Sequence, residues 1–132
     1  MKDLPESPRG LAEHLNIEVT EATPSRCVAT MDVSQVHQQP HGIMHGGSSL
    51  ALAETVASVG AKTACREERQ AFGMEINANH LRPFHTGQLT ATAKPEHVGQ
   101  TSQVWSVEIA DKAGKLICVS RCTMAIRPSP QP

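Results

Sequence analysis

One stretch of the sequence, residues 42–61, constrains the fold more than any other: GIMHGGSSLALAETVASVGA. Two glycines lead into an apolar run of small residues, which predicts a helix over 48–64 with Ser48 as its N-cap. Leucine and valine side chains supply bulk for a core, while the small residues let a curved sheet approach the helix closely. These small residues are Ala51, Ala53, Ala57, Gly60, Ala61 and Ala64.

Segments rich in strand-forming residues surround this helix in the chain. Two strands are expected on either side of the turn at Pro24–Ser25, and a short helix is expected at 11–16. The turn at 111–114 separates the last two strands. The remaining strand segments are 71–80, 88–97, 102–110 and 115–126. One long helix among about six hairpin-linked strands predicts an α+β fold, in which an antiparallel sheet covers one face of the helix.

The length of 132 residues predicts a single domain over 1–132. Its two ends, residues 1–10 and 127–132, are expected to be flexible. The tail RPSPQP is not expected to continue a sheet, because proline cannot donate to a strand ladder.

The charge balance excludes some general binding functions. Twelve Lys and Arg residues stand against thirteen Asp and Glu, and a net charge of −1 gives no broad attraction to nucleic acid or anionic membrane. We find no apolar run long enough to span a membrane and no secretory signal. The four cysteines form no C-x-x-C pair, which indicates reduced, mostly buried thiols in a cytoplasmic protein; the alternative is a redox or nucleophilic cysteine.

Glu54 interrupts the apolar run of the expected helix. Leu50, Glu54 and Ser58 are spaced four residues apart, so they share one stripe of the helix surface. No other charged residue lies between Gly46 and Gly60. One interpretation is an exposed or salt-bridged carboxylate, and the other is a carboxylate held in a partly apolar pocket.

The glycines before the helix favour the second interpretation. Gly46 and Gly47 lie where backbone N–H groups lack acceptors and where the helix dipole favours negative charge. A carbonyl oxygen that gains charge in a transition state would be stabilised there. Glu54 lies about 11 Å of helix rise beyond Gly47. A thioester bound across the helix would still touch both groups, or the two would come from different subunits.

Other polar clusters are less specific. His37, His41 and His45 recur every four residues, but Pro40 and Gly42 argue against a helix there, and we expect no metal site. Near the end of the strand at 71–80, Arg82 would pair with a phosphate or lie in solvent as an ordinary surface arginine. The polar turn in 94–103 would offer N–H and hydroxyl groups to a phosphate, although such turns are common.

Four segments together carry a resemblance to a known family. They are QPHGIMHGGSSLALAETVASVGA, FGMEINANHLRP, KPEHVGQTSQVWSVEIAD and GKLICVSRCTMAI, and they span roughly residues 30–127. In order and spacing they resemble the hotdog-fold acyl-CoA thioesterases. The likeness is greatest to the group that hydrolyses aromatic acyl-CoAs, including the 1,4-dihydroxy-2-naphthoyl-CoA and enterobactin-synthesis proofreading enzymes.

The resemblance implies a helix wrapped by an antiparallel sheet, with two chains forming each active site in a dimer or in a tetramer made of two dimers. It implies that Glu54 is the catalytic carboxylate and that the Gly46 N–H binds the thioester carbonyl. Gln39 and His45 would flank the thioester, and Ser58 would lie near the carboxylate and its water. The segments expected to hold CoA contain Gly73, His80, Leu81, Arg82, Pro83, His97, Val98, Gly99, Gln100, Thr101 and Ser102.

His41 departs from the family pattern, since relatives often have an apolar or aromatic residue there, and this affects the expected acyl preference. The substrates implied are acyl-CoAs such as hydroxybenzoyl-CoA or 1,4-dihydroxy-2-naphthoyl-CoA. No metal or separate cofactor is expected, because CoA is part of the substrate.

Two routes and two other functions remain open at this point. Glu54 would either attack the thioester carbonyl, giving a mixed anhydride, or deprotonate an attacking water. A hotdog-fold dehydratase or hydratase is an alternative, but its D-x-N-P-x-H and H-F-P signatures are missing. A non-catalytic acyl-CoA-binding module is the other alternative, although it would need no carboxylate at position 54.

Overall fold

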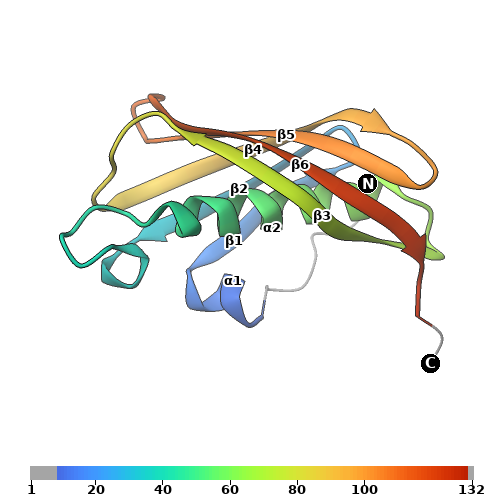
Figure 1. Ribbon diagram of the computed structural model, residues 1–132, viewed down its shortest axis with the longest axis horizontal. Helices are drawn as coiled ribbons and strands as arrows, with labels where there is room; N and C mark the ends of the chain where they lie inside the picture. Colours follow the sequence, from blue (N-terminus) through green and yellow to red (C-terminus); the bar gives the residue numbers. More distant parts are fainter. Residues whose placement is uncertain (1–8, 131–132) are drawn as a thin grey trace.

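The computed structural model describes residues 9–130. Six antiparallel strands form one curved sheet that wraps around the long helix α2, Gly46–Ala64 (Figure 1). The order across the sheet is β1-β2-β4-β5-β6-β3, so β1 and β3 are its edge strands. The strands are β1 (Ile17–Thr23), β2 (Arg26–Val33), β3 (Arg69–His80), β4 (Gly87–Val98), β5 (Ser102–Ala110) and β6 (Leu116–Pro128), with the short helices α1 (Leu11–His14) and η1 (Gln35–His37).

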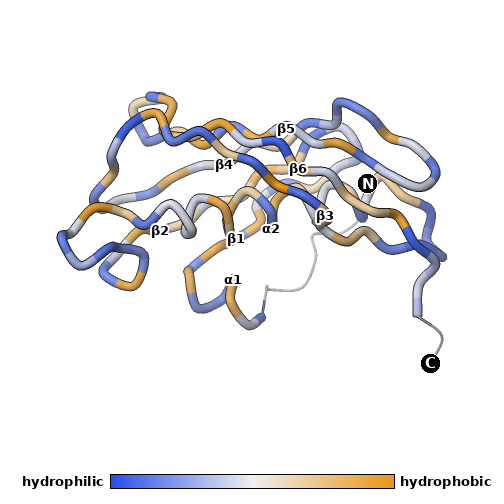
Figure 2. Tube along the Cα trace, viewed as in Figure 1, coloured by the Kyte–Doolittle hydropathy of each residue, from blue (hydrophilic) through white to orange (hydrophobic). Residues whose placement is uncertain are grey.

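The core lies between α2 and the concave face of the sheet. Buried and more exposed residues alternate along most of β2, β5 and β6, as the period of two in a half-buried strand requires. Figure 2 shows hydrophobic and hydrophilic stretches mixed along the sheet. On the helix, Ala53, Ala57, Ala61 and Leu52 are completely buried. The expectation that small residues bring the sheet close to the helix is therefore confirmed.

At Gly60 the helix lies very close to the sheet. A methyl group at this position would lie 2.6 Å from an atom of the Trp105 ring on β5. The indole is fully buried, and its Nε1–H donates to the Gln103 side chain at 2.8 Å. Gln103 in turn donates to the Ala61 carbonyl at 3.3 Å. Packing and hydrogen bonding therefore fix the helix against β5 at the same place.

The structure corrects the expected start of the long helix. The helix begins at Gly46, and its N-cap is His45, whose side chain accepts from the Gly47 N–H. Ser48 lies inside the first turn, where its hydroxyl donates to the His37 carbonyl at 3.1 Å. Because the His45 ring accepts from the Gly47 N–H, the Ser48 hydroxyl is available to bond the His37 carbonyl in the preceding loop.

The expected end of the last strand is also wrong. Strand β6 continues through Arg127 to Pro128, so the first two residues of the tail do extend the sheet. Proline is accepted here because Pro128 lies at the strand end, opposite Arg69 of edge strand β3. Of the ends expected to be flexible, residues 1–8 and 131–132 lie outside the residues that the structure describes.

The other expected strands are observed within a few residues of their predicted limits, including the turn at 111–114, where Gly114 N donates to the Asp111 carbonyl at 3.0 Å. The short helix is confined to Leu11–His14. Within residues 9–130, the helices fall short of the length and apolarity that crossing a membrane would take.

We predict that Gly60→Ala destabilises the protein, although alanine normally favours a helix over glycine. The added methyl group would overlap the Trp105 ring, and such overpacking costs about 1–3 kcal/mol in the free energy of unfolding. Chemical denaturation would measure this cost. In a Trp105→Phe background the cost of Gly60→Ala should shrink, and an equal cost in both backgrounds would disprove the contact.

Candidate functional site

Glu54 projects from the middle of α2 to the surface beside edge strand β3. Its carboxylate lies directly over Gly73: a methyl group there would be 2.5 Å from Oε2 and 3.0 Å from the carboxyl carbon. The register of β3 with β6 shifts between Gly73 and Glu75, which indicates a bulge at this point. Bulges bend a strand and often occur beside active sites. The structure thus brings together two residues that the sequence singled out, Glu54 and Gly73.

A cavity of about 400 Å³ lies beside the Glu54 carboxylate. Ser58 lines this cavity, as its spacing from Glu54 predicts. Thr55 also lines it, but the Thr55 hydroxyl is used by the Ala51 carbonyl at 2.6 Å. Helix α1 supplies a wall that sequence reasoning missed, since the short apolar segment gave no signal of its position. The lining residues are Leu11, Ala12, Ala51, Glu54, Thr55, Ser58 and Val59.

A second cavity, of about 290 Å³, lies at the N-terminal end of α2. The His80 ring packs over Gly46 so closely that a methyl group at Gly46 would lie 2.8 Å from Nε2. Gln39 reaches the same cavity from a tight loop, in which its N–H donates to the Ile43 carbonyl at 2.7 Å. The lining residues are Gln39, Ile43, Met44, Gly46, His80, Leu81, Arg82, Pro83, Phe84 and Ile117.

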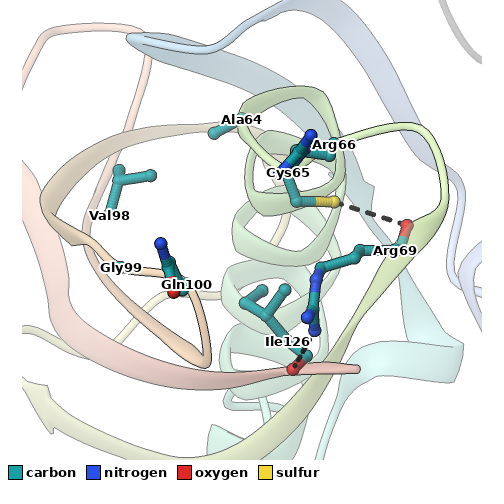
Figure 3. A pocket seen from close by; sticks show the side chains of 8 residues that line it. All are labelled: Ala64, Cys65, Arg66, Arg69, Val98, Gly99, Gln100 and Ile126. Atoms are coloured by element: carbon teal, nitrogen blue, oxygen red, sulfur yellow. Dashed lines mark hydrogen bonds between the residues drawn. The ribbon is translucent and has the colours of Figure 1, made fainter. Parts of the chain in front are cut away.

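A third cavity, of about 340 Å³, lies at the opposite end of α2 (Figure 3). Val98, Gly99 and Gln100 line one side of it. Arg82 and this turn were expected to hold the same phosphates, but one chain places them at opposite ends of the helix. His97 packs on Gly99, while Thr101 and Ser102 complete the turn, which closes through a hydrogen bond from Gly99 N to the Ser102 carbonyl at 2.8 Å.

The predicted residues therefore form three groups rather than one site. Glu54 and Gly46 are separated by eight residues of helix, or about 12 Å of rise. Within one chain they line different cavities. His41 is exposed in the loop next to Gly42, which has a φ of 90°.

His37 joins several segments through its hydrogen bonds, a role that the sequence did not reveal. Its ring is completely buried: Nε2 donates to the Leu15 carbonyl at 2.6 Å, and Nδ1 accepts from the Ser34 N–H at 2.9 Å. Its backbone carbonyl accepts from the His45 N–H at 2.7 Å and from the Ser48 hydroxyl. One residue thus connects the end of α1, the loop that carries Gln39 and the first turn of α2.

Two of the three clustered histidines are held by protein groups. His37 bonds Leu15 and Ser34, and His45 caps the helix. Within residues 9–130, no group of three or more His, Cys, Asp or Glu side chains is arranged to hold a metal ion.

The cysteines do not provide a reactive thiolate next to the carboxylate. All four are free, and three are buried. Burial, together with the negative charges of Glu54 and Glu75, raises the pKa of Cys122 to about 11. Burial and Glu21 raise the pKa of Cys27 to about 11, and burial raises the pKa of Cys118. These three thiols remain protonated at neutral pH.

Comparison with known proteins identifies the class. The chain belongs to the thioesterase superfamily, whose family model matches residues 41–118. It is 42% identical over 118 residues to a 1,4-dihydroxy-2-naphthoyl-CoA hydrolase of Listeria monocytogenes, with 89% of this chain and 96% of the relative covered. It is 40% identical over 116 residues to the proofreading thioesterase EntH of Cronobacter turicensis, with 88% and 85% covered.

A solved thioesterase structure from Haemophilus influenzae matches with a TM-score of 0.86 and 40% identity, over 91% of this chain and 84% of that one. The six-stranded antiparallel sheet around one long helix is thus the hotdog fold, and the expected fold is confirmed. The protein is a thioester hydrolase.

We predict that His37→Ala loosens the loop that carries Gln39 and the start of α2. The substitution leaves the Leu15 carbonyl and the Ser34 N–H without partners, at a cost of about 1–3 kcal/mol for each buried group. Hydrogen exchange should accelerate in residues 38–48 before it does so in β5. The exposed His14→Ala serves as the control, and unchanged exchange in His37→Ala would show that the ring does not hold this loop.

Proposed function

We propose that Glu54 is the catalytic group of this thioester hydrolase and that it acts on acyl-CoA. The observation that carries the proposal is the carboxylate held over Gly73, beside a cavity with apolar walls and the Ser58 hydroxyl. Such surroundings are expected for a carboxylate that acts next to an apolar acyl group. The sequence matches to a 1,4-dihydroxy-2-naphthoyl-CoA hydrolase and to a proofreading thioesterase support the same assignment.

Two routes for the carboxylate lead to the same products. In the first, an Oε atom attacks the thioester carbon, the C–S bond breaks, and the CoA thiolate takes up a proton; water then opens the mixed anhydride. In the second, Glu54 takes a proton from a water that attacks the same carbon. Both routes yield a carboxylic acid and CoA, and neither needs a metal or a separate cofactor.

The developing oxyanion needs donors, and we propose that these lie at the start of α2. The Gly46 N–H belongs to the first turn, where backbone donors lack helical acceptors. Gln39 lines the same cavity, and His45 lies at the helix cap. Because Gly46 and Glu54 of one chain line different cavities, we propose that each active site combines Glu54 of one chain with the Gly46 region of another.

The edge strand β3 offers the surface for this association. It runs for 12 residues, and two large apolar side chains on it, Phe72 and Met74, are 47% and 59% exposed. A long apolar edge is a site for pairing with another strand. Antiparallel pairing of two β3 strands would set the His80 end of one beside the Arg69 end of the other. Arg82 of one chain and the 97–102 turn of its partner would then meet.

We predict that replacing Glu54 by alanine lowers kcat at least about 100-fold, as expected for loss of a positioned base or nucleophile. Gly73→Ala should lower kcat by a smaller factor, because its methyl group displaces the carboxylate. Hydrolysis of benzoyl-CoA, followed with a thiol reagent, measures both. Stable binding without thiol release by the wild type would favour a binding module, and near-normal turnover by Glu54→Ala would exclude the assigned role.

We predict that the protein is at least a dimer, and a tetramer made of two dimers is the preferred assembly. One chain has a mass of 14.2 kDa, so either assembly is easily told from a monomer. Met74→Glu should lower the mass measured by light scattering and reduce activity with it, because a charge on β3 opposes strand pairing. Thr20→Glu on the opposite edge strand is the control. A fully active wild-type monomer at micromolar concentration would refute the assembly.

We predict that aryl-CoAs are hydrolysed with a higher kcat/KM than palmitoyl-CoA. The support is the likeness to a 1,4-dihydroxy-2-naphthoyl-CoA hydrolase and a cavity lined by small and aliphatic side chains. His41 would bind a ring hydroxyl if it reaches the acyl group, and His41→Phe should then lower the ratio of hydroxybenzoyl-CoA to benzoyl-CoA activity by about 10-fold. An unchanged ratio would remove His41 from the site, and palmitoyl-CoA as the best substrate would overturn the aryl preference.

A further inference from the structure

The cavity at the start of α2 contains a polar side chain to which the proposed reaction gives no part. Three polar side chains line this cavity: Gln39, His80 and Arg82. Gln39 is assigned to the oxyanion and Arg82 is expected to hold phosphate, which leaves His80. The His80 ring covers Gly46, whose N–H is the proposed donor to the carbonyl oxygen. A group in this position would meet the reacting atoms of the thioester rather than a remote part of the substrate.

The sheet holds His80 in this position. It is the last residue of β3, where it still pairs with β6, and the N–H of the next residue, Leu81, donates to the Ile117 carbonyl at 2.8 Å. Side chains alternate between the two faces of a strand, so His80 lies on the same face as Ile76 and Ala78, which pack against the core. The strand ladder thus fixes the backbone while the ring points toward α2.

The His80 ring is exposed, and its nitrogens are free to bind a substrate. Among the hydrogen bonds of residues 9–130 none involves this ring, whereas His37 uses both nitrogens and His45 uses Nδ1 for the helix cap. Nε2 is the ring atom nearest to the position of a methyl group on Gly46, at 2.8 Å. Because the Cβ and nitrogen atoms of one residue are about 2.5 Å apart, Nε2 lies no more than roughly 5.3 Å from the Gly46 nitrogen.

This separation leaves room for a thioester group between the ring and the helix. The oxygen and the sulfur of a thioester are bonded to the same carbon, and an oxygen that accepts from the Gly46 N–H lies about 3 Å from that nitrogen. The sulfur can then lie next to Nε2 of His80, with the pantetheine arm continuing past Leu81 toward Arg82. The lining contains no acidic residue, and the start of the helix favours negative charge on the sulfur.

We propose that His80 is a catalytic residue that donates a hydrogen bond from Nε2–H to the thioester sulfur as the CoA thiolate departs. The inference rests on the proposed function, because Glu54 supplies the attack that expels the thiolate. When the C–S bond breaks, its electron pair goes to the sulfur, and the ring hydrogen stays on Nε2. The thiolate takes up a proton from water after its release. A donor of this kind stabilises charge that develops in the transition state, so it lowers the barrier to C–S cleavage.

Two thioesters of similar size and different thiol acidity test this role. His80→Leu should lower kcat/KM for S-benzyl thiobenzoate about 10- to 100-fold, which is the effect of losing a hydrogen bond to a charged group. The same variant should change kcat/KM for S-(para-nitrophenyl) thiobenzoate less than about twofold, because this acidic thiol leaves without the help of a donor. His80→Gln keeps an N–H group and should recover part of the loss with the benzyl thioester. His85→Leu, which replaces an exposed histidine outside the cavity lining, is the matched control.

An equal loss with both thioesters would show that the ring only packs against Gly46 and would overturn the inference, as would normal turnover of the benzyl thioester by His80→Leu. Binding of CoA itself tests the hydrogen bond without hydrolysis. The ultraviolet absorption of the CoA thiolate should appear at a lower pH in the wild-type complex than in the His80→Leu complex, by about one pH unit for a tenfold preference for the thiolate. This difference supports the inference even if Glu54→Ala remains active, an outcome that defeats the proposed function alone. Identical titrations in the two proteins overturn the inference.

Discussion

The close contact between α2 and the sheet is the constraint on which the rest of the structure depends. Gly60 admits the Trp105 ring, and the alanines on the same face let the strands curve around the helix. Since this face is filled by the sheet, the opposite stripe of the helix remains at the surface. A carboxylate on that stripe, Glu54, can therefore stay accessible to solvent while lying one turn from the core.

The edge position of β3 explains why the candidate site residues lie along it. An inner strand has neighbours on both sides, whereas β3 pairs only with β6 and leaves its other side to α2 and to solvent. Gly73 gives room to Glu54 in the middle of the strand, and His80 covers Gly46 at one end. At the other end Arg69 faces the turn after β4. One strand thus orders three cavities along the helix.

Much of this could be read from the sequence, because the decisive signals are local. The small residues of α2 predicted the close sheet, whereas the isolated Glu54 left two interpretations open, an exposed carboxylate or one held in a partly apolar pocket. In the structure Glu54 is exposed and lines a cavity. The helix start was missed because the side chain of His45, rather than that of Ser48, reaches the free N–H groups. The buried His37 ring bonds the carbonyl of Leu15, which lies 22 residues away in the chain. A contact between residues so far apart cannot be predicted from their spacing.

The cap at the start of α2 determines which nitrogen of the His45 ring carries the hydrogen. His45 Nδ1 accepts from the Gly47 N–H at 2.8 Å, so the lone pair on that nitrogen is occupied and the ring hydrogen must sit on Nε2. A ring in this tautomer presents an Nε2–H donor at the start of α2 while Nδ1 holds the cap. In the proposed reaction His45 would therefore polarise a carbonyl oxygen, and the exchange of protons with water would fall to the carboxylate.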